Sequence, residues 1–408
     1  MNNVPPHNIV QSNEIIELLK NEDAMAFLNE HFLESPDLLS LKYSGKVTFN
    51  ITKLTQILHL YRKAKDKIPL WVENRCAMHD KSYAQSSHWE VAQFKSTLFN
   101  GKMLLDLTGG LGVDSYYFSF SFDFVISVER DLTTHQFALY NAAKLGAHNI
   151  QFIQADSNAF AFDNHYDVIY VDPDRRTDTS RILGDIEAYS PNIVEEHKKW
   201  LQHADSVVVK LSPMVDLTLL EKTFPNLKSI YVIGHKNEVK EILIHLVKAD
   251  VETAKKYSVN ISSANRVNQY TSDNYHDSAA TNEYGSFLLE PSKPLIKSGL
   301  SHAYCHQVGI HPIIPKGYYY LHDASIPDFD GRQFEIIEML DGNWKSIKKY
   351  FKSEGIKSIE IAQRHFFDDV ATIRQKLNIK AGGNTSLHFT VNSEGKSLCF
   401  HTKRITET

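Results

Sequence analysis

The sequence predicts an α/β fold: a mostly parallel sheet with helices on both faces, preceded by a helical N-terminal region and followed by smaller α+β modules. Three observations support this prediction. Between residues 99 and 262, short apolar runs alternate with helix-like segments, which is typical of a parallel sheet. These runs are apolar throughout, as strands buried on both faces must be. A glycine-rich bend, "LTGGLG", separates the first run from the first helix.

The residues before this region are predicted to be mostly helical. Apolar side chains recur at helical spacing in residues 13–32, 51–69 and 86–99. Pro69 ends the second of these segments, and Ser86 or Ser87 is the expected N-cap of the third. Residues 1–98 are therefore predicted to form a helical domain.

The central region, residues 99–262, is predicted to alternate between strands and helices. Helices are expected at 113–122, 132–146, 194–204 and 239–248, and Gly146 is expected to end the second of them. Strands are expected at 102–107, 123–129, 149–156, 166–174, 206–213, 227–234 and 256–263.

The rest of the chain is predicted to contain a linker and two small α+β modules. Residues 263–285 are polar and aperiodic, which predicts a linker or an exposed loop. With that linker, residues 263–330 form the first module, which reads as a strand, a helical stretch and the strand "GYYYLHD". Residues 331–408 form the second module, which reads as strand–helix–strand–helix followed by a hairpin that turns at Gly395.

The composition is that of an ordinary globular protein. The 408 residues are 42% hydrophobic and carry a net charge of −5, so the chain as a whole lacks the positive charge typical of nucleic-acid-binding proteins. Cys76, Cys305 and Cys399 are far apart, and the histidines show no ligand spacing, so we expect neither disulfides nor a metal. We find no signal peptide and no run near the roughly 20 apolar residues of a membrane span, so we expect a cytoplasmic protein.

The bend after the first strand predicts a ligand site. Glycines between a strand and a helix let a ligand approach the backbone. Gly110 and Gly112 match part of the G-x-G-x-x-G pattern of dinucleotide sites, but Ser115 takes the third position. Asp106, just before the glycines, would repel a pyrophosphate and attract a cation. S-adenosylmethionine (SAM) carries an ammonium and a sulfonium and no phosphate, so Asp106 favours SAM over NAD.

Acidic residues also follow the next three strands of the predicted sheet. Glu129 ends the second strand, where a carboxylate accepts hydrogen bonds from ribose hydroxyls. Asp156 ends the third strand and is a candidate for binding the adenine amino group. Asp172 opens the motif "DPD" after the fourth strand. These carboxyl ends form the ligand crevice of an open α/β sheet, although each residue alone is equally suited to cap a helix.

The motif "DLTGGLG" resembles the D-x-x-x-G-x-G motif of class I SAM-dependent methyltransferases, which have a Rossmann-like core. Glu129, Asp156 and "DPDR" fall where that family has its later motifs. The resemblance covers residues 99 to 262 and implies cofactor binding by Asp106, Thr108, Gly110, Gly112, Glu129 and Asp156.

The whole layout resembles a bacterial group with a helical N-terminal region, this catalytic core, a ferredoxin-like segment and a C-terminal THUMP-like domain. "QSSHWEVAQFK" and "LLEPSKPLIKSGL" are similar to recurring segments of that group. This resemblance implies an RNA methyltransferase, with rRNA or tRNA as the expected substrate.

The "DPD" motif is expected to carry the chemistry. A nucleophile that loses a proton needs an acceptor, for which Asp172 is the first candidate and Asp174 the second. The carbonyl of Pro173 is a candidate for orienting an amino group. The motif lacks the aromatic residue of D-P-P-[YFW], which stacks on a flipped base; this argues against N6-adenine or N4-cytosine chemistry and leaves the target atom open. Lys210, at the end of the fifth strand, is either part of the crevice or a solvated lysine.

Basic residues suggest two sites for RNA. Arg175 and Arg176 are candidates for binding a substrate phosphate, with a local salt-bridged turn as the alternative. In the last module, Trp344, Tyr350 and Phe351 are interleaved with lysines spaced to share one helix face. Such a face either follows RNA phosphates or is simply solvated. The lysines are Lys345, Lys348, Lys349 and Lys352.

These features together predict a SAM-dependent methyltransferase acting on structured RNA. Three alternatives stay open: a methyltransferase for a protein or a small molecule, an RNA-binding protein that retains SAM without catalysis, and an NAD(P)-dependent oxidoreductase. The sequence leaves the oligomeric state open as well.

Overall fold

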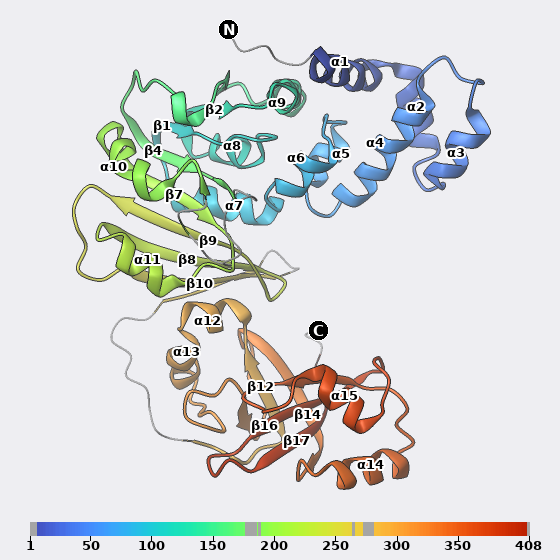
Figure 1. Ribbon diagram of the computed structural model, residues 1–408, viewed down its shortest axis with the longest axis vertical. Coiled ribbons are helices and arrows are strands. Elements are labelled where there is room, and N and C mark those ends of the chain that lie inside the picture. Colours follow the sequence, from blue (N-terminus) through green and yellow to red (C-terminus); the bar gives the residue numbers. More distant parts are fainter. Residues whose placement is uncertain (1–5, 176–185, 187–188, 263–265, 272–280, 406–408) are drawn as a thin grey trace. The chain divides into compact units, whose positions relative to one another are not determined.

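The computed structural model describes residues 6–175, 186, 189–262, 266–271 and 281–405. The chain forms two compact units (Figure 1). Unit 1 consists of Met1–Ser229 and Ile242–Ala254, and unit 2 of Ile230–Glu241 and Lys255–Thr408. The division passes through two strands, β8 (Leu227–His235) and β9 (Glu238–Val247). The four-domain division remains a prediction.

The N-terminal part of unit 1 is helical, as the sequence predicts. Its apolar side chains form one hydrophobic cluster that also contains Leu111 of the glycine bend, Val113 at the start of the helix after the bend, and Phe137 of a later helix. The N-terminal helices therefore share a core with the sheet region. They are α1 (Pro6–Lys20), α2 (Glu22–Glu30), α3 (Pro36–Tyr43), α4 (Ile51–Ala64), α5 (Pro69–Glu73), α6 (Asp80–Gln85) and α7 (Trp89–Leu98).

The mostly parallel sheet of unit 1 is also confirmed. Its strand order is β3-β2-β1-β4-β7-β9, in which only β9 runs antiparallel to its neighbour β7. Successive side chains of a strand point to opposite faces, and Leu104 and Leu105 are both fully buried, so both faces of the sheet are covered. The parallel strands are β1 (Gly101–Asp106), β2 (Phe122–Glu129), β3 (Ile150–Gln154), β4 (Tyr166–Val171) and β7 (Ala204–Leu211).

Helices connect these strands. Gly146 ends the second of them in the left-handed conformation with φ of 69°, as predicted. A short antiparallel pair, β5 (Asp174–Arg175) and β6 (Tyr189–Ser190), follows β4. The helices are α8 (Val113–Phe118), α9 (Leu132–Leu145), α10 (Ile193–His203) and α11 (Leu217–Thr223).

The sequence predicts a helix over residues 239–248, but residues 239–247 belong to strand β9 and Lys248 follows it. Lys236 and Asn237 have φ of 51° and 61° and form the two-residue turn that leads from β8 into β9. Ile242 pairs with Leu211 of β7 and is fully buried. A continuous apolar run fits a buried strand as well as a helix, and here the turn and the sheet decide the outcome.

Unit 2 is an α+β structure built on a six-stranded sheet of order β13-β12-β14-β17-β16-β15. The predicted hairpin is confirmed, because β16 and β17 pair antiparallel and Gly395 has φ of 79°. Since β12 pairs with β14, the segments before and after residue 331 share one sheet. The strands are β12 (Phe287–Pro291), β13 (Tyr320–His322), β14 (Gly331–Leu340), β15 (Glu360–Gln363), β16 (Thr385–Val391) and β17 (Ser397–Arg404); the helices are α12 (Lys293–Ser298), α13 (Ser301–Gln307), α14 (Trp344–Ser353) and α15 (Val370–Leu377).

The polar segment 263–285 is not a loop throughout. Its residues Val267–Tyr270 form β11, which pairs antiparallel with β10 (Lys255–Ile261) and so obtains backbone hydrogen bonds despite its polar side chains. Residues 263–265 and 272–280 lie outside the described residues. Among the helices that the structure describes, none is long and apolar enough to span a membrane.

Candidate functional site

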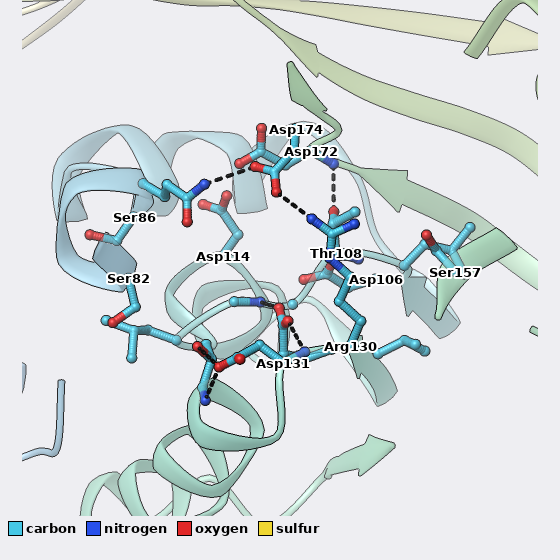
Figure 2. A pocket seen from close by; sticks show the side chains of 18 of the residues that line it. Ser82, Ser86, Asp106, Thr108, Asp114, Arg130, Asp131, Ser157, Asp172 and Asp174 are labelled. Atoms are coloured by element: carbon cyan, nitrogen blue, oxygen red, sulfur yellow. Dashed lines mark hydrogen bonds and ion pairs between the residues drawn. The ribbon is translucent and has the colours of Figure 1, made fainter. Parts of the chain in front are cut away.

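The strand ends that the sequence singles out meet in one pocket of unit 1. Asp106 ends β1, Glu129 ends β2 and Asp172 follows β4, and these three strands are neighbours in the sheet. Parallel strands end at the same edge of a sheet, so the three carboxylates line the same pocket, which Figure 2 shows from close by. Other acidic residues in its lining are Asp114, Asp131 and Asp174.

The glycines of the bend have backbone and packing roles. Gly110 and Gly112 have φ of 54° and 78°, values that other residues adopt only at a cost. A Cβ atom on Gly109 would lie 2.0 Å from Oγ of Ser127 in β2, so this glycine lets the bend pack against the neighbouring strand. Gly110 lines the pocket, whereas Gly112 precedes α8 as its N-cap and lies outside the lining.

Asp106 lines the pocket but is only 1% exposed. Its Oδ1 accepts a hydrogen bond from the backbone N–H of Thr108 at 3.0 Å, and its Oδ2 accepts one from the hydroxyl of Ser115 at 2.6 Å. Burial raises the pKa of Asp106 to about 7 against the effect of these hydrogen bonds. The carboxyl therefore titrates near neutral pH, and a cation bound beside it would favour its ionised form.

Glu129 is placed so that both of its oxygens face backbone donors. Oε2 accepts from the N–H of Gly110 at 3.0 Å, and Oε1 accepts from the N–H of Asp131 at 2.7 Å. Burial raises the pKa of Glu129, and these two hydrogen bonds oppose the rise. Each oxygen keeps a further lone pair, so Glu129 is able to accept hydrogen bonds from a ligand as well.

Asp172 is held by the bend that follows β1 and by strand β7. Its backbone N–H donates to the hydroxyl of Thr108 at 2.6 Å, and its Oδ2 accepts from Nζ of Lys210 at 2.5 Å. Burial raises the pKa of Asp172, while Lys210 lowers it. Lys210 is 14% exposed, so it belongs to the site and is not a solvated lysine.

The other two residues of the "DPD" motif differ from Asp172. Pro173 is buried and lies outside the pocket lining. Asp174 lines the pocket and is about half exposed; its Oδ1 accepts from the side-chain amide of Gln85 at 2.8 Å and its Oδ2 pairs with Arg130 at 3.1 Å. Both oxygens of Asp174 therefore already have partners.

Asp156 is exposed and caps a short 3-10 helix, Ser157–Ala159. Its Oδ1 accepts from the backbone N–H and the side-chain amide of Asn158, at 2.9 and 2.8 Å. The side chain thus has the capping role that the sequence offers as the alternative. Ala155 and Ser157, on either side of it, line the pocket.

Helix α6, its N-cap and the two serines after it form one wall of the pocket, which the sequence analysis does not foresee. Neither Ser86 nor Ser87 is the N-cap of α7: His88 caps it by accepting from the N–H of Glu90 at 3.3 Å. The hydroxyl of Ser87 instead donates to Oδ2 of Asp114 at 2.9 Å. The residues of this wall are His79, Lys81, Ser82, Gln85, Ser86 and Ser87.

Lys95 of α7 is a second unforeseen residue. It is fully buried, and its Nζ lies 3.0 Å from Oδ1 of Asp114 and 3.1 Å from the hydroxyl of Tyr170. Burial opposes ionisation of Asp114, but the nearby lysines and hydrogen bonds outweigh it and hold the pKa of Asp114 below its usual range. The sequence holds one signal for this: Lys95 follows the buried residues Val91 and Ala92 at helical spacing, so it lies on the inner face of α7.

The charges of the pocket fit a cationic ligand better than a pyrophosphate. Asp114, Asp172 and Asp174 are paired with Lys95, Lys210 and Arg130. Asp106, Glu129 and Asp131 then remain as acidic residues of the lining against the basic residue Lys81. The carboxylates would attract the ammonium and sulfonium of SAM and repel the phosphates of NAD. The acidic residues are Asp106, Asp114, Glu129, Asp131, Asp172 and Asp174.

The candidate RNA-binding residues lie in different parts of the chain. Arg175 is in β5, and Arg176 lies outside the described residues. The four lysines of α14 in unit 2 are exposed. The aromatic residues expected between them pack inward: Phe351 is 6% exposed, and the ring of Trp344 packs at a tilt against that of Phe389 with 5.8 Å between ring centroids. The basic face of α14 is therefore a face of lysines alone: Lys345, Lys348, Lys349 and Lys352.

Comparisons with known proteins agree with this architecture. Residues 331–404 match the family described as THUMP domain-like. The chain is similar to the crystal structure of a presumed methyltransferase from Porphyromonas gingivalis W83, with a TM-score of 0.79 and 22% identity over 97% of this chain and 99% of that one. The chain therefore has a Rossmann-like methyltransferase fold and a C-terminal THUMP-like domain.

Weaker structural matches include a presumed class I SAM-dependent methyltransferase from Listeria monocytogenes, with a TM-score of 0.34 and 13% identity over 59% of this chain and 89% of that one. A presumed RNA methyltransferase from Pyrococcus horikoshii matches with a TM-score of 0.30 and 14% identity over 39% and 83% of the two chains. These two matches are too distant to support an argument. No curated protein matches the sequence significantly.

Proposed function

We propose that the protein is a SAM-dependent methyltransferase that acts on structured RNA, either rRNA or tRNA. The observation that carries this proposal is the acidic pocket where Asp106, Glu129 and Asp172 meet at the carboxyl ends of neighbouring parallel strands. A cluster of carboxylates favours a cationic nucleoside over a phosphorylated one. The methyltransferase fold supports the same conclusion.

The residues of the bend and the strand ends would hold SAM, which supplies a methyl group made electrophilic by the sulfonium. Glu129 would accept the ribose hydroxyls with the lone pairs that Gly110 and Asp131 leave free. Asp106, supported by Thr108, would face the cationic end. Gly112 would act through the shape of the bend. Asp156 is the residue expected to bind the adenine. It would do so through the backbone of its neighbours Ala155 and Ser157, which line the pocket.

Asp172 is the proposed proton acceptor. A base works best when its pKa lies near the working pH, and burial raises the pKa of Asp172 in that direction. Thr108 fixes its backbone and Lys210 fixes its carboxylate, so the group is oriented before a substrate binds. Asp174 is the weaker candidate, because Gln85 and Arg130 already occupy both of its oxygens. Pro173 would act through its carbonyl only.

The THUMP-like domain and the lysine face of α14 support RNA as the substrate. The lysines are exposed and lie on one side of a helix whose other side packs into the domain core, a suitable arrangement for following phosphates. Arg175 and Arg176 follow directly after the proposed catalytic motif and are candidates for a substrate phosphate nearer the reaction.

Calorimetry with S-adenosylhomocysteine (SAH) tests the cofactor. We expect a Kd on the order of micromolar, lost in Asp106→Ala and Gly110→Val. Gly45→Val is the matched control for Gly110→Val, because Gly45 has φ of 69° with no atom within 4 Å of an added Cβ. Absence of SAH binding by the wild-type protein, or binding of NAD in its place, would refute the proposal.

Binding of total RNA tests the substrate class. We expect salt-dependent binding that weakens strongly when the four lysines of α14 become glutamate. The matched control changes four other exposed lysines of the same domain: Lys357, Lys380, Lys396 and Lys403. Equal losses in both variants would indicate a general charge effect, and absence of RNA binding by the wild-type protein would favour a protein or a small molecule as the substrate.

A further inference from the structure

We propose, resting on the function proposed above, that the methyl acceptor is a hydroxyl oxygen, the ribose 2′-hydroxyl of RNA. In this reading Lys210 and Ser87 position Asp172 to take the proton of that hydroxyl. Two observations lead to this proposal: a charged cluster behind Asp172, and the lack of an aromatic platform among the described residues that line the pocket.

The cluster consists of two lysines and two aspartates joined through Ser87; we call it the Ser87 cluster. Lys210 contacts Asp172 at 2.5 Å and the hydroxyl of Ser87 at 3.3 Å. On the other side of Ser87, Nζ of Lys95 lies 3.0 Å from Oγ and 3.0 Å from Oδ2 of Asp114. Each carboxylate of the cluster is paired with a lysine ammonium, so the opposite charges offset one another in a buried setting.

Ser87 connects the two ion pairs with all of its hydrogen-bonding capacity. A serine hydroxyl has one proton and two lone pairs. The proton of Ser87 goes to Asp114, and the lone pairs accept from Lys95 and Lys210. The hydroxyl of Ser87 thereby fixes the position of the Lys210 ammonium, and this ammonium in turn fixes the carboxylate of Asp172 at the pocket. Lys210 lies outside the lining and acts through Asp172, so it is a positioning residue.

The described lining of the pocket contains no Phe, Tyr or Trp. The sequence from Pro173 to Ala188, which follows Asp172, contains none either. Enzymes that modify a base take it out of the stack and hold it against aromatic or apolar side chains. The apolar lining residues Leu107, Leu111, Val113 and Val128 are 3% exposed or less, so they offer no open face for a base. A ribose hydroxyl needs no such platform, and a wall of serines, an amide and carboxylates suits a sugar.

The charges also favour oxygen over nitrogen. A neutral nitrogen acceptor gains positive charge during methyl transfer, which the ammonium of Lys210 behind Asp172 would disfavour. A hydroxyl moves toward an alkoxide, which the same ammonium stabilises. In the step proposed here, the hydroxyl gives its proton to Asp172 and its oxygen forms a bond to the sulfonium methyl. The electron pair of the broken carbon–sulfur bond stays on sulfur, and Asp172 later releases the proton to water.

The position of the methyl group is tested with tritiated SAM, the full-length protein and RNA from a strain lacking this gene. A 2′-O-methyl group blocks alkaline cleavage of the next phosphodiester, so we expect the label in alkali-resistant dinucleotides. Label in mononucleotides would indicate base methylation. The inference of a hydroxyl acceptor would then be wrong, whereas the proposed RNA methyltransferase activity would be supported. SAH binding without any label in RNA would overturn the inference together with the RNA substrate, and absence of SAH binding would overturn the cofactor itself.

Once the position is mapped, an RNA carrying 2′-deoxyribose at that nucleotide gives a matched control. We expect it to bind the protein as tightly as the natural RNA and to accept no methyl group. Methylation of the deoxy substrate would overturn the inference.

Lys210→Met tests the positioning role. We expect SAH affinity within about twofold of wild type and kcat lowered by about 10²-fold, with the acid limb of the pH–rate profile moved to higher pH. The reason is that loss of the ammonium raises the pKa of Asp172. Lys210→Arg should keep the wild-type acid limb, and Lys102→Met, which removes an exposed lysine elsewhere, should change nothing.

A titration of Asp172 that requires no catalysis complements these rate measurements. The carboxyl carbon of Asp172, labelled with ¹³C and assigned by its loss in Asp172→Asn, should titrate at higher pH in Lys210→Met than in the wild-type protein. If neither this titration nor the acid limb moves, Lys210 has only a structural role and the proposal for it is wrong.

Discussion

Lys95→Met should destabilise unit 1, and more so at neutral than at acidic pH. Lys95 is fully buried beside Asp114, with contacts of 3.0 Å to that carboxylate. Methionine fills similar space, so the substitution chiefly removes the charge. Removing one partner of a buried ion pair costs about 3–5 kcal/mol, because the other charge stays buried. For a cooperative unit of this size the midpoint of thermal unfolding should fall by roughly 6–20 °C.

The pH dependence follows from the pKa of Asp114. In the wild-type protein burial opposes its ionisation, but Lys95 and Lys210 outweigh burial and hold the pKa of Asp114 below its usual range. A carboxyl with a lowered folded-state pKa adds stability above the unfolded pKa of about 4, and this stability is lost as the pH falls through the folded value. Without Lys95, burial should raise the pKa of Asp114, which then subtracts stability as the pH rises. The gap between the two proteins should therefore be wider at pH 7 than near pH 4.5.

Circular dichroism melts at both pH values measure this gap. Lys102→Met, at an exposed position, should melt like the wild-type protein. The double variant Lys95→Met/Asp114→Asn should recover part of the stability lost at pH 7, because it also removes the buried carboxylate that Lys95→Met leaves without its ammonium partner. A gap of the same size at both pH values, or a double variant less stable than Lys95→Met alone, would refute the reasoning.

Three further outcomes are expected. Glu129→Gln should weaken SAH binding by about 10- to 100-fold in calorimetry, since hydrogen bonds to a charged group contribute about 1.5–3 kcal/mol; unchanged affinity would contradict the role of Glu129. SAH affinity should rise with pH as Asp106 ionises near pH 7, and Ser115→Ala, which removes a hydrogen bond that lowers this pKa, should move the rise to higher pH; a rise at the same pH would show that another group titrates. Gly109→Ala should lower the thermal midpoint, less so in a Ser127→Gly background, because the added Cβ would collide with Oγ of Ser127; equal losses in both backgrounds would point to another cause.

The sheet of unit 1 could be predicted because its strands carry their own signal. Runs such as Leu104–Leu105 before the bend are apolar without alternation, and burial on both faces requires that pattern. The same reasoning fails for β9, because an apolar run of this length also satisfies helical spacing. What decides β9 is its pairing with β7, a contact between residues more than thirty positions apart.

The candidate site was predictable only where its residues follow the strands. Asp106, Glu129 and Asp172 could be named because the strand ends of a parallel sheet converge. Lys95 and Ser87 could not, because their role depends on where α7 packs, and a single lysine or serine in a helical stretch has many ordinary explanations. Asp156 could be predicted either as a helix cap or as a ligand-binding residue, because a carboxylate after a strand suits both roles. Its hydrogen bonds to Asn158 identify it as a cap.

The shared hydrophobic cluster of the N-terminal helices has a practical consequence for dissecting this protein. A fragment beginning at residue 99 would keep the glycine bend and the strand-end carboxylates, but it would lose the serine wall of the pocket and the ammonium that neutralises Asp114. It would also expose the apolar surface around Leu111 and Phe137 to water. The smallest piece that can bind a ligand as the whole chain does must therefore include the helices before the sheet, and swapping those helices between relatives would alter the pocket itself.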